Sequence, residues 1–107
     1  MIVDFEKTEE KEICYCHGGE LSVFVKDILS GKSKVSLIRI PPGASIGSHC
    51  HFENTEYDYA ISGEGTAVIN EITEFIEPGD IHICKQGSMH SILNTSEEDF
   101  IFLSIIS

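Results

Sequence analysis

The chain has 107 residues, of which 41% are hydrophobic, and this length supports one compact domain rather than two. Its formal net charge of −11 argues against nucleic acid or an anionic membrane surface as a partner, because both are polyanions. No apolar run approaches the ~20 residues of a membrane span, and the first residues lack the basic head and apolar stretch of a signal peptide. We therefore expect a cytoplasmic protein that forms a single domain over residues 1–107.

Short strand signals separated by turn residues recur along the whole chain. Residues 1–12 carry mixed charge and favour a short helical turn or a loose N-terminal arm. The predicted strands cover residues 13–17, 21–29, 35–40, 57–61, 66–69, 73–76, 81–84, 90–94 and 100–106. A tight turn is predicted at Asn70-Glu71, and a type II turn at residues 77–80. No amphipathic helix is evident, so the pattern predicts an all-β sandwich or barrel.

The four cysteines are expected to be free thiols, as is usual in a reducing cytosol. The run Cys14-Tyr15-Cys16-His17 has two interpretations: half of a second metal site or a redox pair, or a strand with small buried side chains. We favour the strand, because only half of a usual zinc ligand set is present. His17 precedes a double glycine and is expected to be exposed.

A candidate metal site begins at two histidines that are two positions apart. On an extended strand, the imidazoles of His49 and His51 point to the same face. Glu56 follows after a short polar step and opens the next predicted strand. Two imidazoles and a carboxylate from neighbouring strands suit a divalent transition metal, and His90 offers a fourth ligand.

The spacing of these residues resembles the two motifs of the cupin superfamily. The first motif is matched over residues 43–63 and the second over residues 79–94, at Gly43, His49, His51, Glu56, Gly63, Gly79, Gly87, His90 and Asn94. The one departure is Lys85, which stands where the family usually has proline. Losing that ring loosens the turn before His90 but touches no ligand.

The resemblance implies a double-stranded β-helix, or jelly-roll, barrel. It also implies one divalent transition metal per chain, held by His49, His51, Glu56 and His90. The ligand types accept iron, manganese, nickel, zinc, copper or cobalt and do not choose among them. Asn94 is expected to be structural. By the same resemblance we expect a homodimer, with residues 100–106 and the segment near residues 13–16 as contributors.

Alternation along the strands suggests which further side chains line the cavity. If Glu56 points inward, Asp58 shares its face, whereas Tyr57 and Tyr59 point the other way. Asp58 is then an extra ligand, a general base or a handle for a cationic group, unless the strand twists and carries it to solvent. His82 is a general acid if it faces the metal, although we favour a partly buried, hydrogen-bonded histidine.

Arg39 is the only arginine and alternates with apolar residues. It either clamps a substrate carboxylate in bidentate fashion or lies along the barrel mouth with its head in water.

A metal with free coordination positions predicts a mononuclear metalloenzyme that acts on a small organic molecule. The cupin resemblance allows a dioxygenase, isomerase, decarboxylase or lyase, and the fold does not select among them. The alternative is a non-catalytic small-ligand-binding or sensor protein in which the metal holds the ligand or stabilises the barrel.

Overall fold

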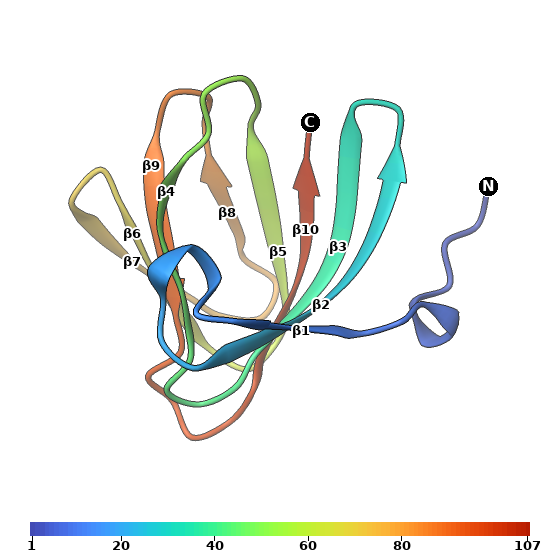
Figure 1. Cartoon of the computed structure of the whole chain (residues 1–107). Helices are drawn as coiled ribbons and strands as arrows, with labels where there is room; N and C mark the ends of the chain where they lie inside the picture. Colours follow the sequence, from blue (N-terminus) through green and yellow to red (C-terminus); the bar gives the residue numbers. More distant parts are fainter.

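The computed structural model describes all residues from 1 to 107 and consists of two antiparallel sheets that face each other (Figure 1). The six-stranded sheet has the order β1 (Lys11–Cys14), β2 (Ser22–Ser30), β3 (Ser33–Ile40), β10 (Phe100–Ile106), β5 (Glu56–Ser62) and β8 (Ile81–Cys84). The four-stranded sheet has the order β4 (Ser45–Cys50), β9 (Met89–Leu93), β6 (Gly65–Ile69) and β7 (Ile72–Ile76). The predicted all-β jelly-roll barrel is confirmed.

The predicted turns form at the predicted residues. Asn70 and Glu71 both have positive φ, at 47° and 69°, and join β6 to β7 in a two-residue hairpin. Gly79 has a φ of 93° within the turn that links β7 to β8, a conformation that suits glycine, and Asp80 closes this turn by donating its N–H to the Glu77 carbonyl at 3.0 Å. The turn before β9 also closes without proline, since the Ser88 N–H donates to the Lys85 carbonyl at 2.9 Å.

The strand predicted over residues 13–17 is wrong in its second half. β1 ends at Cys14, and the chain continues into the short 3-10 helix η2 (Cys16–Gly18). Tyr15 and His17 have φ values of 51° and 49°, which lie in the left-handed region and break the extended backbone. The favoured interpretation of this segment as a strand with buried side chains is therefore corrected: Cys14 is exposed and His17 belongs to a turn.

The helix η2 is held tightly against β4, which carries the first candidate ligand, His49, and leads directly into the second, His51 (Figure 1). The closest approach is backbone to backbone, because a Cβ atom on Gly47 would lie 2.1 Å from the carbonyl oxygen of His17. The Glu20 N–H also donates to Ser45 Oγ at 2.8 Å, and the Ser45 N–H donates to the Glu20 carbonyl at 3.0 Å. Only glycine at position 47 leaves room for this contact, because any side chain there would clash with the His17 backbone. The contact in turn places His17 beside the cavity.

The hydrophobic core fills one end of the space between the two sheets. The Phe100 and Phe102 rings lie 5.1 Å apart at its centre. The remaining core residues come from both sheets and are Val23, Val25, Ile40, Ala44, Ile46, Ala60, Ala67, Ile76 and Ile92. Asn94 closes this end of the barrel by donating to the carbonyls of Ile40 and Glu98 at 2.8 and 2.6 Å, so the expected structural role is confirmed.

The outer face of the six-stranded sheet carries apolar side chains over four neighbouring strands, where an antiparallel sheet usually shows polar side chains to water. Cross-strand register places eight apolar residues in two parallel rows over β3, β10, β5 and β8: Val35, Ile105, Tyr57 and Ile83 in one, and Leu37, Leu103, Tyr59 and Ile81 in the other. We call these eight residues the apolar grid. Tyr57 and Tyr59 are 43% and 44% exposed, which confirms the predicted alternation along β5.

The N-terminal residues form an arm that extends away from the barrel in Figure 1. It contains one 3-10 turn, η1 (Phe5–Lys7), and is tied to the sheet where Lys26 Nζ donates to the Phe5 carbonyl at 2.9 Å. None of the helical segments has the length and apolar character needed to cross a bilayer.

Candidate metal centre

Four predicted ligands come together between the two sheets. His49 lies on β4 opposite His90 on β9, His51 directly follows β4, and Glu56 is the first residue of β5. One ligand atom from each of them lies within 4.8 Å of the others. The structure thus brings the four predicted metal ligands together, although they come from two motifs and two sheets.

The separations between these atoms match a single coordination sphere. His90 Nε2 lies 3.1 Å from His49 Nε2 and 3.3 Å from His51 Nε2. Glu56 presents Oε1 to His51 Nε2 at 3.1 Å and Oε2 to His90 Nε2 at 3.4 Å. Two donor atoms that each lie about 2.1 Å from a metal, at right angles, are about 3 Å apart.

The hydrogen bonds of two imidazoles show which nitrogen faces the centre with a lone pair. His49 Nδ1 lies 2.8 Å from the Gly47 carbonyl oxygen, which only accepts, so His49 donates there and leaves Nε2 unprotonated. His51 Nδ1 lies 2.8 Å from Asn54 Oδ1 and is oriented in the same way. Both Nε2 atoms therefore direct lone pairs toward the centre of the cluster, where His90 Nε2 and the Glu56 carboxylate also lie. Unprotonated imidazole nitrogens gathered with a carboxylate fit a cation.

Burial and neighbouring charges adjust two of the four ligands for this role. Burial lowers the pKa of His90 to about 4, further depressed by His49 and His82 although Glu56 opposes the shift, so its imidazole is neutral near pH 7. Burial acts to raise the pKa of Glu56, but Asp58 and the surrounding imidazoles outweigh it and lower this pKa overall. Neutral imidazole with an ionised carboxylate is the state that a divalent metal requires.

Asp58 points inward behind Glu56 and is 2% exposed, so the inward alternative is the one observed. Neither of its carboxyl oxygens has a hydrogen-bond partner of acceptable geometry. Burial, together with the neighbouring Glu56 carboxylate, raises the pKa of Asp58 to about 10. Asp58 is therefore a protonated acid in the metal-free protein. It does not belong to the four-residue cluster.

Asp58 is one member of a row of polar side chains that crosses the inner face of the six-stranded sheet. Successive register pairs place these side chains side by side on five strands, in the order Asp27, Ser36, Ser104, Asp58 and His82. The last four are buried. At this level the inner face of the sheet therefore presents polar groups, whereas the hydrophobic core is packed with apolar side chains.

A pocket of about 240 Å³ opens beside the four ligands and reaches three of them, His49, His51 and Glu56. Its walls are largely apolar, formed by Ile13, Val23, Val25, Ile38, Ile46 and Ile106. Lys34 is the only lysine or arginine that lines it, and its Nζ lies 3.8 Å from Asp27 Oδ1. The pocket therefore offers a small organic ligand apolar walls, a cluster of metal ligands and one lysine, which is paired with the Asp27 carboxylate in the same wall.

His17 forms part of the pocket wall, although it is exposed on its other side as predicted. Its ring stacks on the His49 ring with 4.2 Å between centroids and an angle of 16° between the planes. Burial, with His49 and His51 nearby, lowers the pKa of His17. Sequence reasoning missed this contact, and its only signal was the pair of glycines, Gly19 and Gly47, at which the two segments meet.

Arg39 does not reach the pocket. It lies on the outer face of the six-stranded sheet, over the Phe24 ring at 4.2 Å, and pairs with Glu10 at 2.9 Å and Asp99 at 3.5 Å. The interpretation of Arg39 as a clamp for a substrate carboxylate is corrected by this placement. Lys34, which the sequence did not single out, is the cation that lines the pocket.

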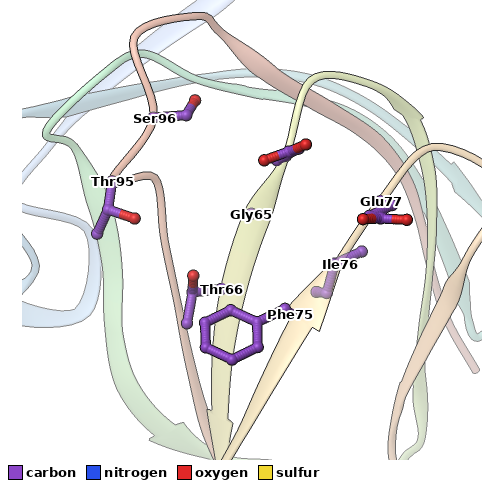
Figure 2. Close-up of a pocket in the computed structure, with 8 residues that line it drawn as sticks. Gly65, Thr66, Phe75, Ile76, Glu77, Thr95 and Ser96 are labelled. Atoms are coloured by element: carbon purple, nitrogen blue, oxygen red, sulfur yellow. The ribbon is translucent and has the colours of Figure 1, made fainter.

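A second hollow, of about 220 Å³, lies away from the ligands, over β6, β7 and the segment that follows β9 (Figure 2). Figure 2 shows the Phe75 ring beside Thr66, its partner in the β6–β7 pairing, with Glu77, Thr95 and Ser96 along the rim. No histidine or cysteine lines it. The chemistry of the chain is therefore concentrated in the pocket beside the four ligands.

Comparisons with known proteins agree with this architecture. Residues 36–106 match the family model described as a cupin domain. The chain is 32% identical over 112 residues to an oxalate-binding protein of Thermotoga maritima, with 99% of this chain and 93% of that protein covered.

Solved structures give the same assignment. A predicted oxalate decarboxylase from Thermotoga maritima is similar with a TM-score of 0.94 at 31% identity, with 99% of this chain and 97% of that chain covered. A conserved protein with a double-stranded β-helix domain from Klebsiella pneumoniae has a TM-score of 0.78 at 27% identity, with coverage of 99% and 88%. The fold, the two motifs and these matches show that the chain belongs to the cupin family.

Proposed function

We propose that this cupin holds one divalent transition metal on His49, His51, Glu56 and His90 and binds a small carboxylate beside it, with oxalate as the first ligand to test. The observation that carries the proposal is the convergence of four acceptor groups, three of them buried, at a pocket whose single lysine or arginine is Lys34. A divalent metal in that position supplies Lewis-acid attraction for a carboxylate oxygen. The names of the relatives support oxalate as the choice of ligand.

The proposal is tested by calorimetric titration of oxalate into metal-loaded protein and into the same protein treated with chelator. Manganese, iron, cobalt, nickel, copper and zinc are loaded in turn, because the ligand set does not select one of them. Binding that requires the metal supports the proposal. Equal binding with and without metal, or no binding with any metal, contradicts it.

Replacing Lys34 with methionine is expected to weaken oxalate binding to the metal-loaded protein about tenfold. Methionine removes the positive charge from the pocket but keeps most of the length of the lysine side chain. Lys34 also acts to lower the pKa of His17, another residue of the pocket wall, in the same direction as burial and the neighbouring imidazoles. Lys32→Met is the matched control, since Lys32 is exposed and does not line the pocket. Equal losses in both variants would show that only the overall charge matters.

A second candidate function is turnover of the bound carboxylate, which His17 favours. Its imidazole lines the pocket beside His49 and has a lowered pKa, so it is available to accept and return a proton. In a decarboxylation of oxalate the carbon–carbon bond breaks, carbon dioxide leaves, and a proton adds to the remaining carbon to give formate. Carbon-13 NMR of labelled oxalate distinguishes the two functions: labelled formate indicates an enzyme, and unchanged oxalate indicates a binding protein.

We also propose that the protein is a homodimer joined through the apolar grid. The chain carries a net charge of −11, but the grid has no charged residue, so two grids can meet without bringing acidic groups together. In a two-fold symmetric dimer the grid of one subunit packs against the grid of the other, so both apolar surfaces are covered in the same interface.

A Tyr59→Asp variant is expected to run as a monomer, because the interface would then bury an unpaired carboxylate at its centre. Light scattering coupled to size exclusion measures the mass, which should be twice the 11.8 kDa of one chain for the wild type. Phe75→Asp introduces the same charge at a residue that is 80% exposed and outside the grid, and it should remain dimeric. A wild-type monomer at low micromolar concentration would contradict the proposal.

A further inference from the structure

Three side chains from consecutive strands form a hydrogen-bonded chain that ends at the metal centre. Glu74 on β7 lies with Oε1 2.7 Å from His82 Nδ1 on β8, and His82 Nε2 lies 3.0 Å from His90 Nδ1 on β9. We propose that Glu74 and His82 are positioning residues, which fix the tautomer and ring orientation with which His90 faces the metal. This inference rests on the proposed function, because it concerns how one metal ligand is held.

The direction of the two hydrogen bonds follows from the ends of the chain. At the inner end, His90 Nε2 faces the Nε2 atoms of His49 and His51, so a lone pair at that position requires the hydrogen of His90 to be on Nδ1. That Nδ1–H points at His82 Nε2, which must then accept.

The outer end imposes the same direction. With Nε2 as an acceptor, the hydrogen of His82 lies on Nδ1 and donates to the Glu74 carboxylate, which only accepts. Glu74 thus selects the tautomer of His82, and His82 selects the tautomer of His90. Partners beyond the direct ligands set the orientation and basicity of metal-binding histidines in this way.

The positions of these three residues in the two sheets explain why both Glu74 and His82 are needed to hold His90. β7 is an edge of the four-stranded sheet and β8 is an edge of the six-stranded sheet, and no backbone ladder joins them. His82 is 3% exposed and reaches across this seam, whereas the Glu74 side chain is 48% exposed at its outer end. The two hydrogen bonds therefore connect the two sheets beside His90.

A competing arrangement uses the same atoms. Asp58, His82 and His90 form a second group whose ligand atoms lie close enough to hold an ion, which would replace the hydrogen bond between the two imidazoles. The separation of 3.0 Å between His82 Nε2 and His90 Nδ1 is that of a direct hydrogen bond, and Glu74 Oε1 lies within hydrogen-bond distance of the other His82 nitrogen at 2.7 Å. This unbroken pair of hydrogen bonds favours the positioning role over a second metal.

The first test compares zinc affinity, measured by competition with a chromophoric chelator, among three variants of the full chain. Glu74→Ala is expected to weaken zinc binding about tenfold, because His82 Nδ1 loses the carboxylate that accepts its hydrogen bond. Glu74→Gln should recover most of this loss, since the amide oxygen still accepts from His82. Glu77→Ala removes the same charge nearby on an exposed residue whose side chain makes no hydrogen bond, and it should match the wild type.

The second test reads the tautomers directly through long-range proton–nitrogen-15 correlations in the zinc-loaded wild type. The expected result is a hydrogen on Nδ1 of both His82 and His90. A hydrogen on Nε2 of His82, two equivalents of zinc per chain, or a Glu74→Ala variant with wild-type affinity would each overturn the positioning role while leaving metal binding intact. A wild type that binds no metal would overturn the proposed function and this inference with it.

Discussion

Replacing Glu56 or His49 with alanine is expected to remove stoichiometric metal binding while the chain stays folded. Each residue supplies one of four converging ligand atoms, and Glu56 supplies the only ionised carboxylate among them. Protein purified without added metal or chelator should contain about one equivalent of a transition metal, and each variant should contain almost none. Elemental mass spectrometry measures the content, and circular dichroism checks the fold.

Glu53→Ala is the control for these variants, because Glu53 is an exposed carboxylate in the same loop and lies outside the ligand cluster. It should retain the metal content of the wild type. Metal that persists in both ligand variants, or that never binds to the wild type even after reconstitution, would contradict the four-ligand site. The identity of the metal would also direct the assays, since iron favours oxygen chemistry and manganese favours decarboxylation of oxalate.

The sequence predicted those parts of the site that depend on local alternation or on motif spacing. Along β5 the side chains alternate from Glu56 to Ile61, so the placement of Asp58 on the same face as Glu56 follows from the sequence, although the sequence left open whether Asp58 reaches solvent instead. The spacing of the motifs added His90, which lies far from Glu56 in the chain but opposite His49 in the sheet.

The parts that the sequence did not predict depend on breaks in alternation or on contacts between sheets. Tyr15 and His17 adopt left-handed conformations for which their residue types give no signal, so η2 was missed. The hydrogen bond from His82 to Glu74 joins the edges of two sheets, and the order of strands cannot be derived from alternation.

The sequence also left open whether Arg39 faces the cavity, for a reason that alternation explains. Lys34 and Arg39 lie on the same strand, β3, at positions of opposite parity. They must therefore point to opposite faces, but the sequence does not say which face is inward. The structure resolves this by placing Lys34 in the pocket and Arg39 outside it.

The metal-free protein is expected to lose stability as the pH rises from about 7 to about 8.5, by about 1.4 kcal/mol of unfolding free energy per pH unit. The cause is Asp58, whose pKa rises from an ordinary value of 3.8 to about 10 on folding. Between these two values the unfolded chain has released the proton and the folded chain has kept it. The native state then binds one more proton than the unfolded state, so raising the pH favours unfolding.

The other shifted groups act outside this window. The lowered pKa values of His90 and His17 raise stability with pH only below the ordinary histidine value of 6.5, and the lowered pKa of Glu56 acts only below 4.5. The raised pKa values of Cys84 and Cys16 reduce stability only above the ordinary thiol value of 9.0. Asp58 therefore makes the largest contribution to the slope between about pH 7 and 8.5.

Asp58→Asn should abolish this slope, because the amide keeps the shape of the protonated acid and cannot ionise in the unfolded chain. Urea unfolding in the presence of chelator at three pH values across the window measures the slope for each protein. Glu53→Gln removes an exposed carboxylate and should keep the wild-type slope. A flat wild-type profile would show that Asp58 ionises in the folded state, and the metal centre would then contain two charged carboxylates instead of one.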